Sequence, residues 1–178
     1  MRLIIFLILI LFSLTQSFAL DQKYLYILND KCIEELYFDA KIFFKNSEIA
    51  IIKDSRGIIL RSEIKNPTSE FYELTTETYK KAILIESFLA KIQKSAIIEV
   101  HMGEVEKNYA ESFKRWEIST VIANKIESAI LKQSGKVIPT KINSVGYGEF
   151  LPIKNTSNNG GKYLNRLDII ILCNISGE

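Results

Sequence analysis

Trp116-Glu117-Ile118-Ser119, Gly146-Tyr147-Gly148-Glu149 and Asn165-Arg166-Leu167-Asp168-Ile169 are the three stretches that decide the fold. The first lies in a segment with helical periodicity, from about Phe113 to Lys132. The second begins a long loop rich in Asn and Gly. The third runs into five consecutive apolar positions from Ile169 to Cys173, a pattern typical of a strand that is covered on both faces.

Further strands are predicted on the amino-terminal side of these stretches and between them. Ile49 to Ile64 reads as two short strands around the turn Asp54-Ser55-Arg56-Gly57, in which the glycine suits a positive φ. We expect Ile58 to Ile64 to be the first strand of the domain. Ala96 to Val100 is predicted as the next strand and Lys141 to Val145 as the one after it.

Two long helices are predicted between the strands. Thr75 or Thr76 can cap the first, and Glu77 in its first turn is favourable against the helix dipole. Strands and helices in this order predict a two-layer α/β domain. The apolar faces predicted are Ala82, Ile85, Leu89 and Ile92 on the first helix and Trp116, Ala123, Ile126 and Ile130 on the second.

In order and spacing the three stretches resemble the carboxy-terminal half of an OmpA-like domain of the MotB type. That family writes them as Trp-Glu-Leu-Ser-x-x-Arg-Ala, Gly-Tyr-Gly-Glu-x-x-Pro-Ile and Asn-Arg-Arg-(Val/Leu)-(Glu/Asp)-Ile. The resemblance covers residues 113–172 well and extends less clearly back to about residue 51. It implies a β-α-β-α-β-β order, with two long helices on one face of a mixed sheet, and it implies peptidoglycan binding.

The ligand positions that the resemblance implies are only partly matched. The family holds the diamino acid of a stem peptide with an Asp, in Gly-His-Thr-Asp, and with the Arg of the helix stretch. Here Gly103 stands at the Asp position and Ile122 at the Arg position, and an unpaired desolvated charge would cost about 1 to 3 kcal/mol. We therefore do not expect the usual binding mode. The family-equivalent positions are His101, Gly103, Glu104, Ser119, Ile122, Asn165 and Arg166.

Three charged residues next to these positions offer substitutes for the missing pair. Glu104 follows the position of the missing acid, and Lys114 and Arg115 precede the helix stretch. Solvated surface charges are the simpler interpretation of Lys114 and Arg115, whereas both interpretations stay open for Glu104.

The remaining matched positions imply structural roles. His101 corresponds to the family's histidine, and we expect it to be hydrogen-bonded to nearby backbone. Ser119 is expected to be a structural hydroxyl. One of the two arginines of the last strand is missing, and either could correspond to Arg166.

Residues 1–19 have the pattern of a secretory signal peptide: Arg2, an apolar run from Leu3 to Phe12, and small residues at Ser17 and Ala19. We expect cleavage after Ala19 and export to the periplasm or cell envelope, with no membrane span in the mature chain. The competing interpretation is an uncleaved anchor, but the run is shorter than the roughly 20 apolar residues that a span needs. It also lacks the acidic residue expected of a MotB-type stator protein.

Residues 20–48 are predicted to be an aromatic-rich extension ahead of an OmpA-like domain at 49–178. The alternation of aromatic and charged residues indicates short strands or a packed segment and not a flexible linker. Cys32 and Cys173 could pair in an oxidising compartment, or Cys173 could be a buried free thiol, and both interpretations stay open.

The composition disfavours catalysis and nucleic-acid binding. The 23 basic and 21 acidic residues are scattered along the chain, so no nucleic-acid partner is expected. A single histidine and two distant cysteines give no metal-ligand spacing, no nucleophile motif and no sign of a cofactor. Two hypotheses remain: a non-catalytic module that binds peptidoglycan through a rearranged pocket, or a degenerate module that docks with envelope proteins.

Overall fold

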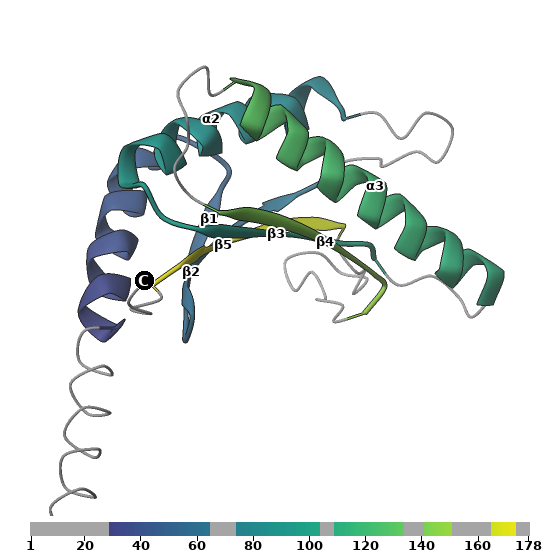
Figure 1. Cartoon of the computed structure of the whole chain (residues 1–178), viewed down its shortest axis with the longest axis horizontal. Helices are drawn as coiled ribbons and strands as arrows, with labels where there is room; N and C mark the ends of the chain where they lie inside the picture. Colours follow the sequence, from purple (N-terminus) through teal and green to yellow (C-terminus); the bar gives the residue numbers. More distant parts are fainter. Residues whose placement is uncertain (1–28, 65–73, 104–108, 134–140, 151–164, 174–178) are drawn as a thin grey trace, which may run out of the picture.

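The computed structural model describes residues 29–64, 74–103, 109–133, 141–150 and 165–173, with only the backbone of 109–113. Three helices cover one face of a mixed sheet, as Figure 1 shows. The α/β class and two-layer arrangement are confirmed, with one more helix than the two predicted. Within the described residues, no helix has the length and apolar character needed to cross a membrane.

The sheet has five strands in the order β1-β2-β5-β3-β4. The final strand, β5, lies at the centre and pairs antiparallel with β2 and with β3. Its central position explains the uninterrupted apolar run in its sequence, because both faces of β5 are buried. The strands are β1 (Ala50–Asp54), β2 (Gly57–Glu63), β3 (Ala96–His101), β4 (Ile142–Gly148) and β5 (Arg166–Leu172).

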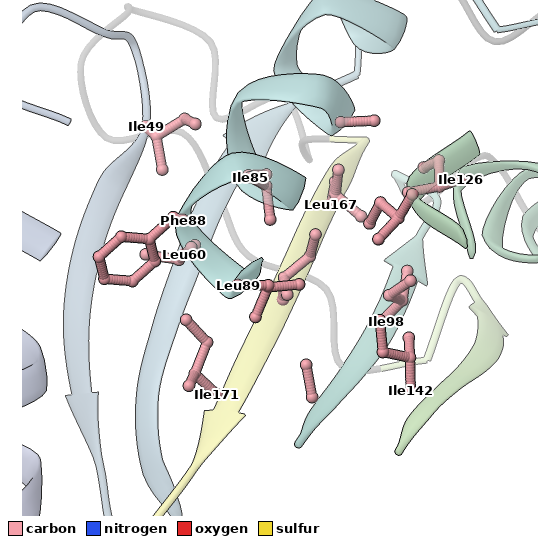
Figure 2. Close-up of a cluster of buried hydrophobic side chains, with 14 of the residues drawn as sticks. Ile49, Leu60, Ile85, Phe88, Leu89, Ile98, Ile126, Ile142, Leu167 and Ile171 are labelled. Atoms are coloured by element: carbon pink, nitrogen blue, oxygen red, sulfur yellow. The ribbon is translucent and has the colours of Figure 1, made fainter. Parts of the chain in front are cut away.

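Helix α2 (Thr76–Ile92) connects β2 to β3, and α3 (Tyr109–Gln133) connects β3 to the parallel strand β4. Of the two predicted caps Thr75 is the one used, and its Oγ1 accepts from the backbone N–H of Thr78 at 3.2 Å. Figure 2 shows Ile85 and Leu89 of α2 lying over the sheet, where Ile98 and Ile171 belong to the same buried cluster. Burial of these side chains supplies most of the driving force for joining the two layers.

Trp116 departs from the predicted apolar stripe. Ala123, Ile126 and Ile130 are fully buried, but the Trp116 side chain is 46% exposed. The stripe is therefore shorter than predicted, because the first part of α3 approaches β4 through its backbone and leaves the indole at the surface. A second difference concerns β4, which continues through Gly146 to Gly148, where the sequence predicted the start of a loop.

The extension contains a helix, at residues 29–43, which we call the N-terminal helix. The prediction of a packed segment is confirmed, and the alternative of short strands is wrong for this part. The aromatic side chains explain the difference, because the rings of Phe43 and Phe44 pack against Phe88 of α2, one tilted and one edge-on. Each ring centroid is 5.1 Å from that of Phe88. Ile33 and Leu36 belong to the main core cluster, so the helix folds as part of the domain.

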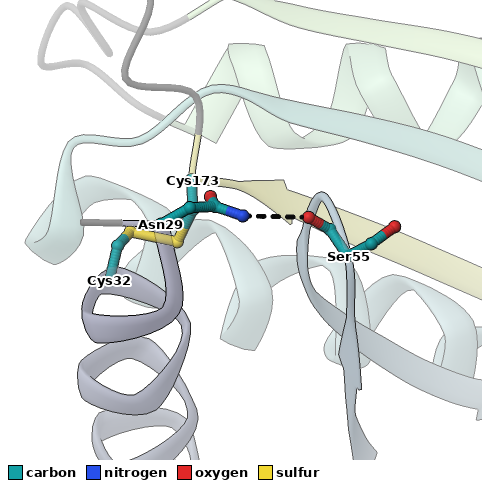
Figure 3. Close-up of a disulfide and its surroundings, with 4 residues drawn as sticks. All are labelled: Asn29, Cys32, Ser55 and Cys173. Atoms are coloured by element: carbon teal, nitrogen blue, oxygen red, sulfur yellow. Dashed lines mark hydrogen bonds between the residues drawn. A yellow bond between two sulfur atoms is a disulfide. The ribbon is translucent and has the colours of Figure 1, made fainter. Parts of the chain in front are cut away.

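A disulfide ties the N-terminal helix to the residue after β5. Figure 3 shows Cys32 joined to Cys173, close to the hydrogen bond from Asn29 to the carbonyl oxygen of Ser55. The Cα atoms of the two cysteines are 5.9 Å apart, and 141 positions separate them in the sequence. The bond therefore resolves the two interpretations of Cys173, and it closes nearly the whole domain into one covalent loop.

Helix α3 lies so close to β4 that two glycines are required. A Cβ on Gly146 would be 2.2 Å from the backbone nitrogen of Thr120, and Gly148 has a φ of +54° with its Cβ position 3.0 Å from Cα of Trp116. The Trp-Glu-Ile-Ser and Gly-Tyr-Gly stretches are therefore in direct contact. Their spacing in the sequence reflects the packing of one helix on one strand.

We predict that replacing both cysteines with alanine lowers the free energy of unfolding by about 2 to 5 kcal/mol, because the unfolded chain regains the freedom of a long loop. Thermal unfolding with and without a reductant measures this effect. The wild type should lose stability in reductant and the double variant should not change. Equal stability of the reduced and oxidised wild type would contradict the prediction.

We also predict that Gly146→Ala destabilises the domain by at least about 1 to 3 kcal/mol, because the added methyl group collides with backbone in α3. Urea denaturation measures the loss. Asn143→Ala, at an exposed position of the same strand, is the matched control and should change stability by less than about 0.5 kcal/mol. Similar losses in the two variants would show that the close packing is not limiting.

Candidate functional site

The end of β3 meets the start of β5 and the first turns of α3, and this region we call the strand-end site (Gly103, Arg115 and Asn165). The N–H of Gly103 donates to Oδ1 of Asn165 at 2.7 Å. The guanidinium of Arg115 donates from Nη1 to the carbonyl oxygen of Gly103. Arg115 is thus half-buried and bonded at the position of the family's acid, while Lys114 is exposed, as a solvated charge would be.

Ile122, at the position of the family's arginine, is part of the hydrophobic core. Ile122 is only 3% exposed and Met102 only 4%, and both belong to the main apolar cluster. A charged ligand group beside Ile122 would therefore lose its hydration without gaining a partner from that residue. Glu104, the other possible substitute, lies outside the described residues.

Ser119 has both of its hydrogen-bonding functions occupied. Its Oγ donates to the carbonyl oxygen of Trp116 and accepts from the N–H of Gly148, each at 2.8 Å. The residue is fully buried, so it cannot contact a ligand from outside. Its hydroxyl joins α3 to β4, the structural role that the sequence predicts.

His101 is buried on the face of the sheet opposite the helices, 1% exposed. Its Nδ1 lies 3.2 Å from the carbonyl oxygen of Phe150, which can only accept, so Nδ1 carries the proton. Its ring stacks on Tyr147, with centroids 4.8 Å apart and planes 3° apart. Tyr147 of β4 and Phe150, just after that strand, therefore hold the imidazole in one orientation, with Nε2 near the carboxylates of Glu99 and Asp168.

Arg166 is not at the surface of the strand-end site but is buried on the same sheet face as His101. Its Nε donates to Oδ2 of Asp168 at 3.0 Å. Arg61 of β2 binds the same carboxylate with two hydrogen bonds, of 2.7 and 2.8 Å. Burial raises the pKa of Asp168, but the bonds from Arg61 and Arg166 outweigh it and hold that pKa below the usual value.

Glu99 completes this charged group from the next strand. It lies directly opposite Asp168 in the register of β3 and β5, and its Oε1 is 3.5 Å from Nη1 of Arg56. Burial, followed by the charge of Glu99, raises the pKa of Tyr147. The helix-free face thus carries a charged cluster that we define as Glu99, His101, Asp168, Arg61 and Arg166.

The sequence did not reveal this cluster, although one signal was present. The strand predicted from the sequence ends at Val100, but β3 continues to His101. Glu99 and His101 are two positions apart on it, so their side chains share a face. Asp168 joins them only because β5 inserts between β2 and β3, and the sequence does not give that strand order. Carboxylate and imidazole side chains in such proximity can serve as ligands of a transition-metal ion.

Comparison with known proteins places the fold in one structural class. No protein-family model matches the chain, and no curated protein is significantly similar in sequence. Among solved structures, an outer membrane protein from Borrelia burgdorferi has 25% identity and a TM-score of 0.50, over 70% of this chain and 96% of that one. Periplasmic domains of MotB and a MotB-like protein are also among the similar structures, so the chain has the fold that the sequence resemblance predicted.

Two further structures share the fold at lower identity. A putative MotB-like protein from Desulfovibrio vulgaris has 16% identity and a TM-score of 0.57, over 84% of this chain and 99% of that one. The cell wall anchor of the type VI secretion system from Pseudomonas aeruginosa has 12% identity and a TM-score of 0.53, over 79% and 96%. At these identities the likeness concerns the fold alone.

We predict that Asp168 makes the domain sensitive to acid. Because its pKa in the folded state is depressed, its contribution to stability is complete above the unfolded value of 3.8 and is lost as the pH falls through the folded value. Asp168→Asn should cost about 3 to 5 kcal/mol at neutral pH, since two partly or fully buried guanidiniums lose their partner.

Urea denaturation from pH 7 down to pH 3 measures this effect. The difference in stability between wild type and Asp168→Asn should shrink as the pH falls. A difference that stays constant across this range would show that the carboxylate charge contributes nothing. Asp54→Asn is a matched control for another aspartate with a lowered pKa, in an exposed turn, and should have a much smaller effect.

Proposed function

We propose that this protein is an exported, non-catalytic cell-envelope protein that associates with peptidoglycan through a rearranged pocket. The arrangement at the strand-end site carries the proposal. Arg115 brings a guanidinium to Gly103, where the family resemblance places an acid, and Asn165 holds the backbone of the same residue. The shared fold supports the class, since one of the similar structures is described as a cell wall anchor.

The rearrangement follows from the helix geometry of α3. Arg115 precedes Ile122 by seven residues, so the two lie on the same face of the helix, two turns apart. The positive charge that the family places at the position of Ile122 is therefore present two turns earlier. An arginine there can bind a carboxylate of a stem peptide with two parallel hydrogen bonds.

The polarity of the site differs from the family pattern as well. With Gly103 in place of an acid, the described residues offer a guanidinium, an amide side chain and backbone groups, which suit a carboxylate better than an ammonium group. We infer that the preferred wall component presents a free carboxylate and does not require its ammonium group to be paired.

A second function is favoured by the burial of Ile122 and Met102. If the apolar filling of the family pocket excludes any wall component, the domain serves as a docking subunit of an envelope complex. Phe38 and Ile42, one turn apart on the N-terminal helix and 66% and 57% exposed, would then belong to the protein-binding surface.

Pelleting of the mature protein with purified sacculi tests the proposed function. We predict that the wild type sediments with sacculi and that Arg115→Ala weakens binding by about tenfold or more, the loss expected for one charge-assisted hydrogen-bonded pair. Lys114→Ala is the matched control, because this neighbouring cation is exposed, and it should bind like the wild type. Wild-type protein that stays wholly in the supernatant would refute wall binding.

Recovery of a stoichiometric partner from host envelopes separates the two functions. Loss of that partner in Phe38→Ser/Ile42→Ser, with sacculus binding absent in the wild type, would establish docking in place of wall binding. Retention of sacculus binding in the same double variant would support the first function.

A further inference from the structure

The charged cluster contains a buried nitrogen, Nε2 of His101, that has no hydrogen-bond partner among the described residues. Since Nδ1 donates to the carbonyl oxygen of Phe150, Nε2 of the neutral ring carries a lone pair. A buried acceptor without a partner is costly, so this lone pair requires a donor or a cation.

Two carboxylates face the same lone pair. Oε2 of Glu99 is 3.5 Å from Nε2, and Oδ2 of Asp168 is 3.9 Å from it. These three atoms all lie within 4.8 Å of one another, and each of the three residues is buried. Oδ2 of Asp168 also accepts from Arg61 and Arg166, but His101 Nε2 has no hydrogen-bond partner within the part of the chain that the structure describes. A cation at the centre of these three acceptors would offset the repulsion among them.

We propose that Glu99, His101 and Asp168 form a binding site for a divalent transition-metal ion, with Zn²⁺ as the best-fitting ion. One imidazole nitrogen and two carboxylate oxygens are a ligand set that Zn²⁺ accepts, whereas Mg²⁺ and Ca²⁺ prefer oxygen ligands alone. Ligands at about 2.0 to 2.2 Å from a tetrahedral Zn²⁺ lie roughly 3.3 to 3.5 Å apart. The pair from Glu99 and His101 is already 3.5 Å apart, and the cluster, which spans up to 4.8 Å, must contract by about 1 Å at its widest.

The surroundings of His101 match those of a metal-binding histidine. In metal sites the second ring nitrogen donates to a carboxylate or a backbone carbonyl, which fixes the tautomer and the orientation of the ring. The bond to Phe150 does this here, and the stacked Tyr147 ring restricts rotation further.

The arginines on this face of the sheet lower the affinity of the site for a metal ion, because they compete for the same carboxylates. Oδ2 of Asp168 accepts from both Arg61 Nη2 and Arg166 Nε, and it must release at least one of these bonds in order to bind a metal. Glu99 is less engaged, because Arg56 approaches its other oxygen, Oε1, and is itself 46% exposed. We therefore expect Glu99 and His101 to be the dominant ligands, and an affinity lower than that of a site with unpaired carboxylates.

Nitrogen NMR of the imidazole tests the proposal directly, because His101 is the only histidine in the chain. The full-length mature protein, with its disulfide intact and without a polyhistidine tag, is labelled with ¹⁵N-histidine and titrated with Zn²⁺ at neutral pH. The Nε2 resonance should shift in a saturable way, while Nδ1 keeps the signature of a protonated nitrogen.

Two variants complete the experiment. Glu99→Gln should weaken Zn²⁺ binding by at least about tenfold while leaving the backbone spectrum native. Glu34→Gln, which removes an exposed carboxylate paired with Lys53, is the control and should bind Zn²⁺ like the wild type. An Nε2 resonance that does not move at millimolar Zn²⁺, or equal binding by Glu99→Gln, would overturn the proposal.

Discussion

The close approach of α3 to β4 is the constraint on which the rest of the structure depends. Gly146 and Gly148 leave no room for a Cβ against the helix, and Ser119 joins the two elements through a buried hydroxyl. This contact fixes the end of β4, whose Gly148 carbonyl in turn accepts from the N–H of Met102. The positions of both candidate sites follow from it, because the first turns of α3 carry Arg115 and the residues around the end of β4 contact His101.

The two sites use opposite faces of the sheet in different ways. On the helix side the strand ends and α3 bring a guanidinium to Gly103, in a region that the family resemblance associates with ligand binding. On the other face, acidic and basic side chains from three central strands are buried together, and their charges are largely balanced by direct pairing. Such pairing stabilises mainly by preventing unpaired buried charge, since desolvation offsets much of the attraction.

The Trp-Glu-Ile-Ser, Gly-Tyr-Gly-Glu and Asn-Arg-Leu-Asp-Ile stretches predicted the fold because some of their residues make close backbone contacts that few other residue types allow. Gly146 and Gly148 are examples of such contacts. The apolar run of β5 was informative for another reason, because it reflects the central place of this strand in the sheet. The charged cluster could not be predicted in the same way, because Asp168 reaches Glu99 only through long-range strand pairing. The helical extension was missed for a related reason: its aromatic residues pack on Phe88 of α2, and alternation of polar and aromatic residues does not report such a partner.

The proposed function depends on contact between the strand-end site and the cell wall. Backbone NMR of the protein without residues 1–19, titrated with soluble peptidoglycan fragments that carry a free stem-peptide carboxylate, tests this contact. We expect saturable shifts at the amides of Gly103, Arg115 and Asn165, with little change on the N-terminal helix. Shifts confined to the N-terminal helix around Phe38 and Ile42, or a spectrum that does not change at all, would contradict it.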